Sequence, residues 1–149
     1  MYLSKELLGI IAAVFALSAH AFYVHQTISS KIKPHAFTWL VWGLMSGIVF
    51  AAQLLKGGGA GAWATGVTAL ACFFITGFAF FKGKADFTKS DWVFFLSALF
   101  SLALWYLTKD PTASVILVVV TDMLATLPTI RKAYRRPHEE AATLFVLNI

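Results

Sequence analysis

Charged residues are scarce in this chain. Of its 149 residues only 13% are Asp, Glu, Lys or Arg, whereas 59% are hydrophobic. A soluble domain has about 25% charged and about 45–50% apolar residues, so this chain has too little polar surface to enclose its apolar residues in water. The scarcity of charge excludes a soluble globular domain and indicates an integral membrane protein that contacts the lipid bilayer.

Cysteine is nearly absent as well. The single cysteine, Cys72, cannot form an intrachain disulfide, and the four histidines lack the spacing of metal ligands. The sequence has no nucleophile–base pair and no phosphate-binding loop. These absences predict a protein that is not an enzyme and holds no metal or other cofactor. The net charge of +5 lies in loops between apolar segments, so it indicates membrane topology and not a nucleic-acid partner.

Five apolar segments are candidates to cross a membrane. A transmembrane helix needs about 20 apolar residues, and the segments are 7–24, 36–55, 61–81, 92–107 and 112–130, the fourth being short. The first is too long for the core of a typical signal peptide, although cleavage after Ala21 is an alternative. A sixth run starts at Ala141 and has nine residues, so we expect a natural truncation or a fragment of a longer protein.

The Lys and Arg residues divide unequally between the two sides of the membrane. Because successive loops alternate sides, three fall on the side of the N-terminus, namely Lys5, Lys56 and Lys109. Nine fall on the other side: Lys31, Lys33, Lys82, Lys84, Lys89, Arg131, Lys132, Arg135 and Arg136. Cytoplasmic loops carry the excess of positive charge. The split therefore predicts an N-terminus outside and a multi-pass location in the cell membrane, most simply a bacterial inner membrane.

Two segments of the chain resemble each other. The segment "YVHQTISSKIKPHAFTWLVW" starts at Tyr23, and "TLPTIRKAYRRPHEEAATLFVL" starts 103 residues later at Thr126. Pro34-His35 then aligns with Pro137-His138, and each segment connects an apolar span through a basic loop to another apolar run. An internal repeat of this kind indicates that the fold contains the same structural unit twice. We expect an all-α polytopic membrane protein with a three-helix repeat at 1–81, a linker helix at 82–110 and the start of a second, parallel three-helix repeat at 111–149.

In these segments and their order the chain resembles the PQ-loop family, which includes the SWEET and SemiSWEET sugar transporters. The Pro-Gln pair that names the family is half present in each segment. The first segment has His25-Gln26 at this place and keeps the glutamine, and the second has Pro128-Thr129 and keeps the proline. The resemblance implies transport of a small polar solute such as a sugar or an amino acid, by alternating access with Pro128 and Gln26 at the hinge positions. It also implies assembly into a homodimer or a larger membrane complex.

Several side chains in the spans are candidates to bind the solute. His20 and Tyr23 share a face of small residues on the first span, where His20 either bonds a neighbouring helix or binds substrate or protons. Thr68 lies in a stripe of small, weakly polar residues that either packs against other helices or lines a cavity. Trp39 has the position of a residue in the aromatic belt at the membrane interface, and Trp42 lies about one turn deeper in the membrane. By the resemblance, the ring of Trp42 would stack on substrate.

Asp122 is the most informative candidate. It lies ten residues beyond Thr112, about 15 Å along a helix and close to mid-membrane. A carboxylate there costs several kcal/mol unless it is paired, protonated or facing water. We expect it to face the bundle with His20 as its nearest titratable partner. It would then either hydrogen-bond the substrate or couple transport to protons, or else only join two helices. Pro128 should free the carbonyl of Leu124 and kink the helix.

These features favour a PQ-loop-type transporter or transporter fragment. The alternative from another class is an accessory membrane subunit that packs against a larger complex and transports nothing. A homodimer that encloses a polar cavity would favour the transporter. A chain that lies beside unrelated subunits, with its cavity filled by side chains, would favour the accessory subunit.

The charge split predicts the topology directly. In a chain with Cys72 replaced by serine, a cysteine introduced at Ser4 should react with an impermeant maleimide on whole cells, and one introduced at Arg135 should not. Both should react after permeabilisation. Labelling at position 135 of intact cells, without labelling at position 4, would overturn the predicted orientation.

Overall fold

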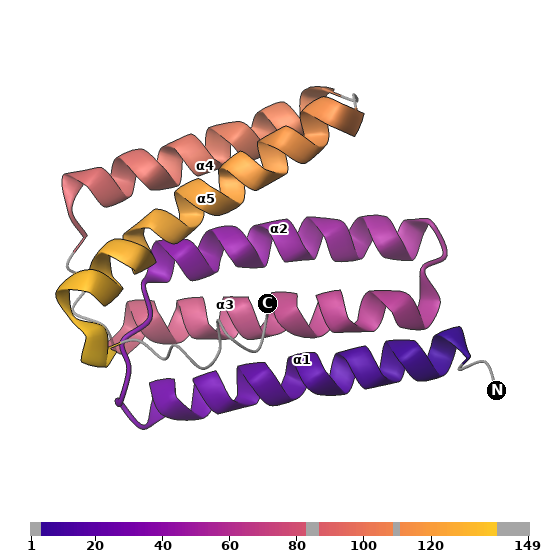
Figure 1. Cartoon of the computed structure of the whole chain (residues 1–149), viewed down its shortest axis with the longest axis horizontal. Coiled ribbons are helices and arrows are strands. Elements are labelled where there is room, and N and C mark those ends of the chain that lie inside the picture. Colours follow the sequence, from indigo (N-terminus) through magenta and orange to yellow (C-terminus); the bar gives the residue numbers. More distant parts are fainter. Residues whose placement is uncertain (1–3, 83–86, 109–110, 140–149) are drawn as a thin grey trace.

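Helices make up nearly all of the structure. The computed structural model describes residues 4–82, 87–108 and 111–139, and this part contains no strand. Five long helices appear in Figure 1, with a short 3-10 turn before α3 and another after α5. They are α1 (Lys5–Ile28), α2 (Ala36–Leu55), η1 (Gly59–Ala62), α3 (Trp63–Lys82), α4 (Lys89–Thr108), α5 (Pro111–Arg135) and η2 (Pro137–Glu139). The expected sixth apolar run, from residue 141, lies outside the described residues.

The helices have the length and surface of membrane spans. In the described part of the chain four segments are long and apolar enough to cross a bilayer, namely α1, α2, η1 with α3, and α4. The fifth expected span, 112–130, lies within α5, which is not among these four. Large apolar side chains such as Phe15 and Leu70 point outward, away from the core. The prediction of a multi-pass helical membrane protein is confirmed at this level.

Two groups of helices meet along α2. In Figure 1, α3 lies between α1 and α2, and it packs against both of them. Helices α4 and α5 pack against each other along their length, and both contact α2. Among the described helices, α2 is the one that joins the pair α4–α5 to the three-helix layer. Any motion between the two groups therefore takes place at the surface of α2.

Local capping sets where two helices begin. The hydroxyl of Ser4 accepts the N–H of Leu7 at the start of α1. At the start of α4, the carboxylate of Asp91 accepts the N–H of Thr88, and the N–H of Asp91 points back to the Thr88 hydroxyl. This reciprocal pair is a capping box. It starts α4 at Lys89, three residues before the apolar segment from which the span was predicted.

Glycine is required where α2 turns into η1. Gly57 and Gly59 have φ values of 73° and 49°, in the region that side chains with a Cβ rarely adopt. At Gly58 a Cβ would lie 2.8 Å from the carbonyl oxygen of Gln53. The three consecutive glycines thus form the tight turn between α2 and η1.

A second glycine contact holds α1 against the turn before α3. A Cβ added at Gly9 would lie 2.5 Å from the backbone oxygen of Ala60 in η1. The three nearest atoms are the backbone oxygen and carbon of Ala60 and its Cβ, none of which can rotate away as the end of a flexible side chain would. Gly9 therefore lets α1 approach η1 closely, in the way that small residues do between membrane helices.

Replacing Gly9 should test this approach. Gly9→Ala should destabilise the bundle by about 1–3 kcal/mol, because the new methyl group overlaps backbone atoms. Gly77→Ala on α3 is the matched control, since its Cβ would meet no atom within 4 Å. Thermal unfolding in detergent, followed by circular dichroism, would compare the two. Equal stability of both variants would show that α1 and η1 are not in close contact.

Candidate functional site

Two hydroxyl groups join α2 to α5. The hydroxyl of Thr38 donates to the carbonyl oxygen of Ala125 at 2.7 Å, and the hydroxyl of Thr129 donates to that of Thr38 at 2.9 Å. Both threonines are buried. Pro128 lies between the two α5 residues, is itself buried, and is followed by the rest of an unbroken helix. The threonine of α2 thus bonds the backbone of α5 in the turn where proline disturbs the regular hydrogen bonds.

A further contact between α2 and α5 joins Trp42 and Asp122. The indole Nε1–H of Trp42 donates to Oδ1 of Asp122 at 2.9 Å. Trp42 lies one turn beyond Thr38 on α2, and Asp122 lies one turn before Ala125 on α5. We call these five residues the α2–α5 seam: Thr38 and Trp42 of α2 with Asp122, Ala125 and Thr129 of α5.

Aromatic rings continue from the seam into the three-helix layer. The Trp42 ring lies edge-on to that of Trp39, with centroids 5.4 Å apart. The ring centroid of Trp39 lies 4.6 Å from that of Tyr23 and 6.5 Å from that of His20, and the rings of Trp39 and His20 form a T-shaped pair. Four predicted site residues, His20, Tyr23, Trp42 and Asp122, are therefore connected through Trp39. That residue is 1% exposed and lies in the core, so it is not the interfacial belt residue that its position in the sequence suggested.

His20 and Asp122 do not contact each other in the described structure. Nδ1 of His20 lies 2.8 Å from the carbonyl oxygen of Ala16, one turn back in α1. Asp122 accepts a hydrogen bond from Trp42, and its side chain is otherwise exposed. Two tryptophans thus lie between the groups that the sequence paired directly.

The remaining predicted residues lie apart from these contacts. Thr68 is half-buried on α3, and the described structure gives its hydroxyl no hydrogen bond. On the same stripe Cys72 is buried, and its carbonyl accepts the hydroxyl of Thr76. Gln26 is half-buried in the last turns of α1, where its carbonyl accepts the N–H of Lys31. Neither Thr68 nor Gln26 reaches the α2–α5 seam through a described hydrogen bond.

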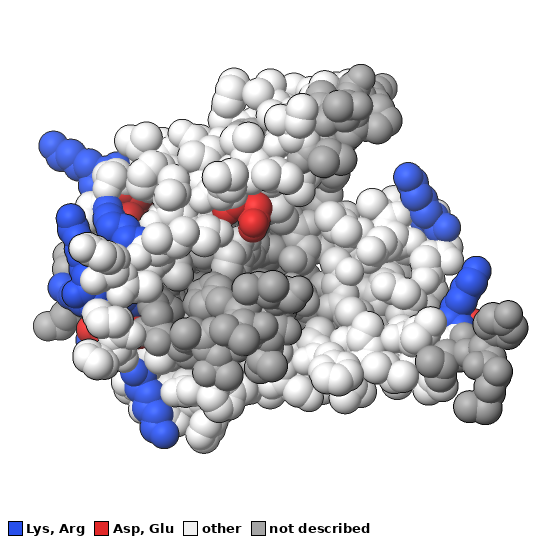
Figure 2. Space-filling view, in the orientation of Figure 1, with Lys and Arg blue, Asp and Glu red and all other residues white. Residues whose placement is uncertain are grey.

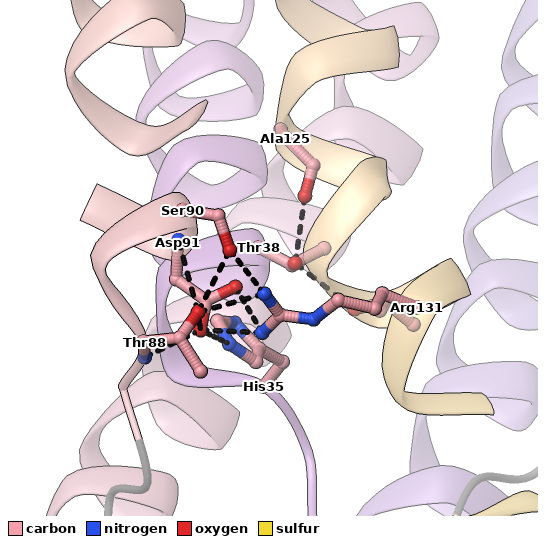
Figure 3. Close-up of polar contacts among 8 residues, drawn as sticks. His35, Thr38, Thr88, Ser90, Asp91, Ala125 and Arg131 are labelled. Carbon is pink, nitrogen blue, oxygen red and sulfur yellow. Dashed lines mark hydrogen bonds and ion pairs between the residues drawn. The ribbon is translucent and has the colours of Figure 1, made fainter. Parts of the chain in front are cut away.

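A buried ion pair joins α4 to α5 (Figure 3). The Asp91 side chain is completely buried, and Nη2 of Arg131 donates to both of its carboxylate oxygens at 2.5 and 2.6 Å. Nη1 of Arg131 donates to the hydroxyls of Thr88, at 2.7 Å, and Ser90. The guanidinium therefore binds the same residues that cap α4, so one side chain of α5 holds the first turn of α4 in place.

His35 lies beside this ion pair. It precedes α2 and is 8% exposed, and its Nε2 lies 3.6 Å from Oδ2 of Asp91. That distance is too long for a hydrogen bond, and neither ring nitrogen has a hydrogen-bond partner in the described structure. Burial lowers the pKa of His35. Asp91 raises this pKa, whereas the charges of Lys132 and Arg131 lower it, and the net shift is downward.

The loop before α2 also contacts η2. The backbone N–H of Lys33 donates to the carbonyl oxygen of Glu139, and its ammonium lies 2.7 Å from the Glu139 carboxylate. This bond from Lys33 lowers the pKa of Glu139. Because Lys33 is 64% exposed, the pair lies at the surface and contributes little to stability.

Sequence reasoning did not identify Asp91, Arg131 or His35 as a group. Arg131 was counted as a loop charge, and His35 entered only through the repeated Pro-His pair. One local signal was available: Thr88 and Asp91 have the spacing of a capping box. Nothing local connects Asp91 to an arginine 40 residues away, so the ion pair follows only from the packing of α4 on α5.

Comparisons with protein-family models, with curated proteins and with solved structures find no match for this chain. Its function is therefore inferred from its own residues.

The buried ion pair should contribute more to stability than the surface pair. Asp91→Asn leaves the Arg131 guanidinium without a countercharge and should cost about 3 kcal/mol, the lower end of the usual range because Arg131 is 26% exposed. The control is Glu139→Gln, which breaks the exposed pair with Lys33 and should cost less than about 1 kcal/mol. Unfolding in detergent with increasing SDS measures both. Equal losses would contradict a structural role for Asp91.

His35 should make stability depend on pH. Because its pKa is lowered in the folded state, the unfolded chain binds a proton more readily, and stability should fall as pH drops below about 6.5. His35→Gln should reduce this fall, whereas His25→Gln, an exposed histidine at the end of α1, should leave it unchanged. Melting temperatures between pH 8 and pH 5.5 would measure the difference. Identical pH curves for wild type and His35→Gln would exclude this role.

Proposed function

We propose that this chain is a PQ-loop-type membrane transporter, or part of one, for a small polar solute. The observation that carries the proposal is the pairing of Asp122, near the middle of α5, with Trp42 of the apolar helix α2. An ionisable side chain at this depth is costly, and such residues mark substrate or proton pathways in membrane proteins. Asp122 is exposed in the described structure, so a solute can reach it.

The helix arrangement supports the same proposal. Helices α1–α3 form one layer and α4–α5 a second group. The α2–α5 seam contains Asp122 and Trp42, and the buried Pro128 directly precedes its residue Thr129. In the proposal, residues 1–81 form the first repeat, 82–110 contain the linker helix, and α5 begins the second, parallel repeat at 111–149. Pro128 and Gln26 occupy the hinge positions. Alternating access then opens and closes the surface at which α5 meets α2.

Charge supports the proposed orientation. Figure 2 shows the Lys and Arg side chains at the two ends of the helices, with mostly uncharged residues between them. The larger group lies at the end that holds the loop before α2 and the C-terminal part of α5. By the positive-inside rule this end is cytoplasmic and the N-terminus lies outside, in the proposed setting of a bacterial inner membrane. A second copy of the chain, or a larger assembly, would complete the transporter.

One observation favours the accessory-subunit alternative. Tyr23 is 0% exposed, Trp39 is 1% exposed and His20 is buried, so these three rings fill the space inside the three-helix layer. A region filled in this way offers a solute no space. In this alternative Asp122 and Trp42 only join α2 to α5, and the outward apolar faces contact other subunits as well as lipid.

Transport assays separate the two proposals. Proteoliposomes containing the purified chain should take up at least one solute from a panel of sugars, amino acids and small amines, and Asp122→Asn should reduce that uptake at least tenfold. The reason is that asparagine keeps the shape of the side chain but cannot ionise. The control is Glu6→Gln, an exposed acid at the start of α1 that lies far from the seam in sequence. Uptake by the Asp122→Asn variant equal to wild type, with the same pH profile, would exclude Asp122 from the site.

A further inference from the structure

Asp91 lies beside two basic side chains, and only one of them is hydrogen-bonded to it. Nη2 of Arg131 donates to both carboxylate oxygens, whereas Nε2 of His35 lies 3.6 Å from Oδ2. Figure 3 shows the His35 ring and the Arg131 guanidinium converging on this carboxylate. His35 is 8% exposed, and neither ring nitrogen has a hydrogen-bond partner in the described structure. A buried imidazole without partners costs free energy, and a proton on the ring would draw it to the carboxylate.

The neutral ring has no place on Asp91, because Oδ2 is already fully used. This oxygen accepts the backbone N–H and the hydroxyl of Thr88, both at 2.9 Å, and Nη2 of Arg131 at 2.6 Å. A carboxylate oxygen has about two lone-pair positions for donors, so a fourth donor must displace one of these three. A neutral imidazole competes poorly with a guanidinium, since hydrogen bonds between charged groups are stronger. An imidazolium carries the same charge as the guanidinium and can displace it.

Of the two cations, Arg131 is the one that can leave. Its side chain is 26% exposed and belongs to the last turns of α5, so it can turn toward water and the lipid headgroups. The ring of His35 is buried and packs edge-on against Phe37 and Phe87, at centroid distances of 6.0 and 5.8 Å. Its cation therefore has Asp91 as its partner and no path to water. A proton on His35 thus favours the loss of Arg131 from Asp91.

Three charged side chains from two other helices act on the His35 ring: Asp91 of α4, and Arg131 and Lys132 of α5. Lys33, in the same loop as the ring, is paired with Glu139. Burial lowers the pKa of His35, Asp91 raises it, and the two cations lower it further, so the ring takes up its proton below about pH 6.5. Once charged, the ring repels the same two cations, which adds to the loss of Arg131 from the carboxylate.

We propose that His35 is a proton-binding site, and that a proton on its ring transfers Asp91 from Arg131 to His35. The proton comes from water, and the other bonds that change are hydrogen bonds. Because Arg131 holds the first turn of α4 on α5, its departure releases this end of α4. His35 directly precedes α2, so the exchange moves the attachment of α4 from α5 to the start of α2. This inference goes beyond the proposed transport function and does not depend on it.

Distances between pairs of spin labels test the exchange. In the full chain with its one native cysteine replaced by serine, labels at Val93 of α4 and Tyr134 of α5, both exposed, report on the separation of these helices near the ion pair. In lipid nanodiscs this distance, measured by electron paramagnetic resonance, should increase when the pH falls from 8 to 5. Labels at Phe15 of α1 and Leu70 of α3, also exposed, form the control pair, and their distance should stay constant.

Two variants assign the change to one histidine. His35→Gln stays neutral and should keep the α4–α5 distance constant, whereas His138→Gln, at an exposed position in η2, should behave as the wild type. If His35→Gln does not fold, the wild-type chain still decides. Its His35 ring signals, assigned by replacing the other three histidines, should titrate with the same midpoint as the distance. A constant α4–α5 distance in the wild type, a different midpoint, or an equal increase in His35→Gln would overturn the exchange.

Discussion

Lipid offers no hydrogen-bond partner, so every polar group on the inward side of α5 has to find one within the protein. This constraint determines where α5 lies. Thr129 and the carbonyl of Ala125 meet Thr38, Asp122 meets Trp42, and Arg131 meets Asp91. The first two contacts hold α5 on α2, and the third holds it on α4. The positions of α4 and α5 thus follow from a few polar groups, in a bundle whose outer surface carries many large apolar side chains.

The two acids that these contacts involve have opposite environments. Asp91 is completely buried, bound by Arg131 and by the backbone of Thr88, so its charge is balanced and its position is structural. Asp122 is exposed and accepts one hydrogen bond, from the neutral indole of Trp42. The difference separates an acid that stabilises the fold from one whose charge remains available. The proposed transport site rests on that difference.

The sequence predicted the helices better than their contacts. The apolar runs located α1, α2 and α3, because the length of an apolar run is a local property of the sequence. Asp122 was recognised since a single acid stands out in an apolar run. Trp39 was placed at the membrane interface and lies in the core instead, and Asp91 was not singled out. Both depend on packing between distant segments, which no local pattern encodes.

The central claim is that Trp42 binds Asp122 at the seam between α2 and α5. The chain has five tryptophans, so a two-dimensional ¹H–¹⁵N spectrum in lipid nanodiscs should show five indole N–H signals, and Trp42→Phe assigns one of them. Asp122→Ala removes the acceptor and should shift that signal strongly and make its proton exchange faster with water, while Trp63 at the start of α3 keeps its signal. A Trp42 signal that is unchanged by Asp122→Ala would contradict the seam and the site built on it.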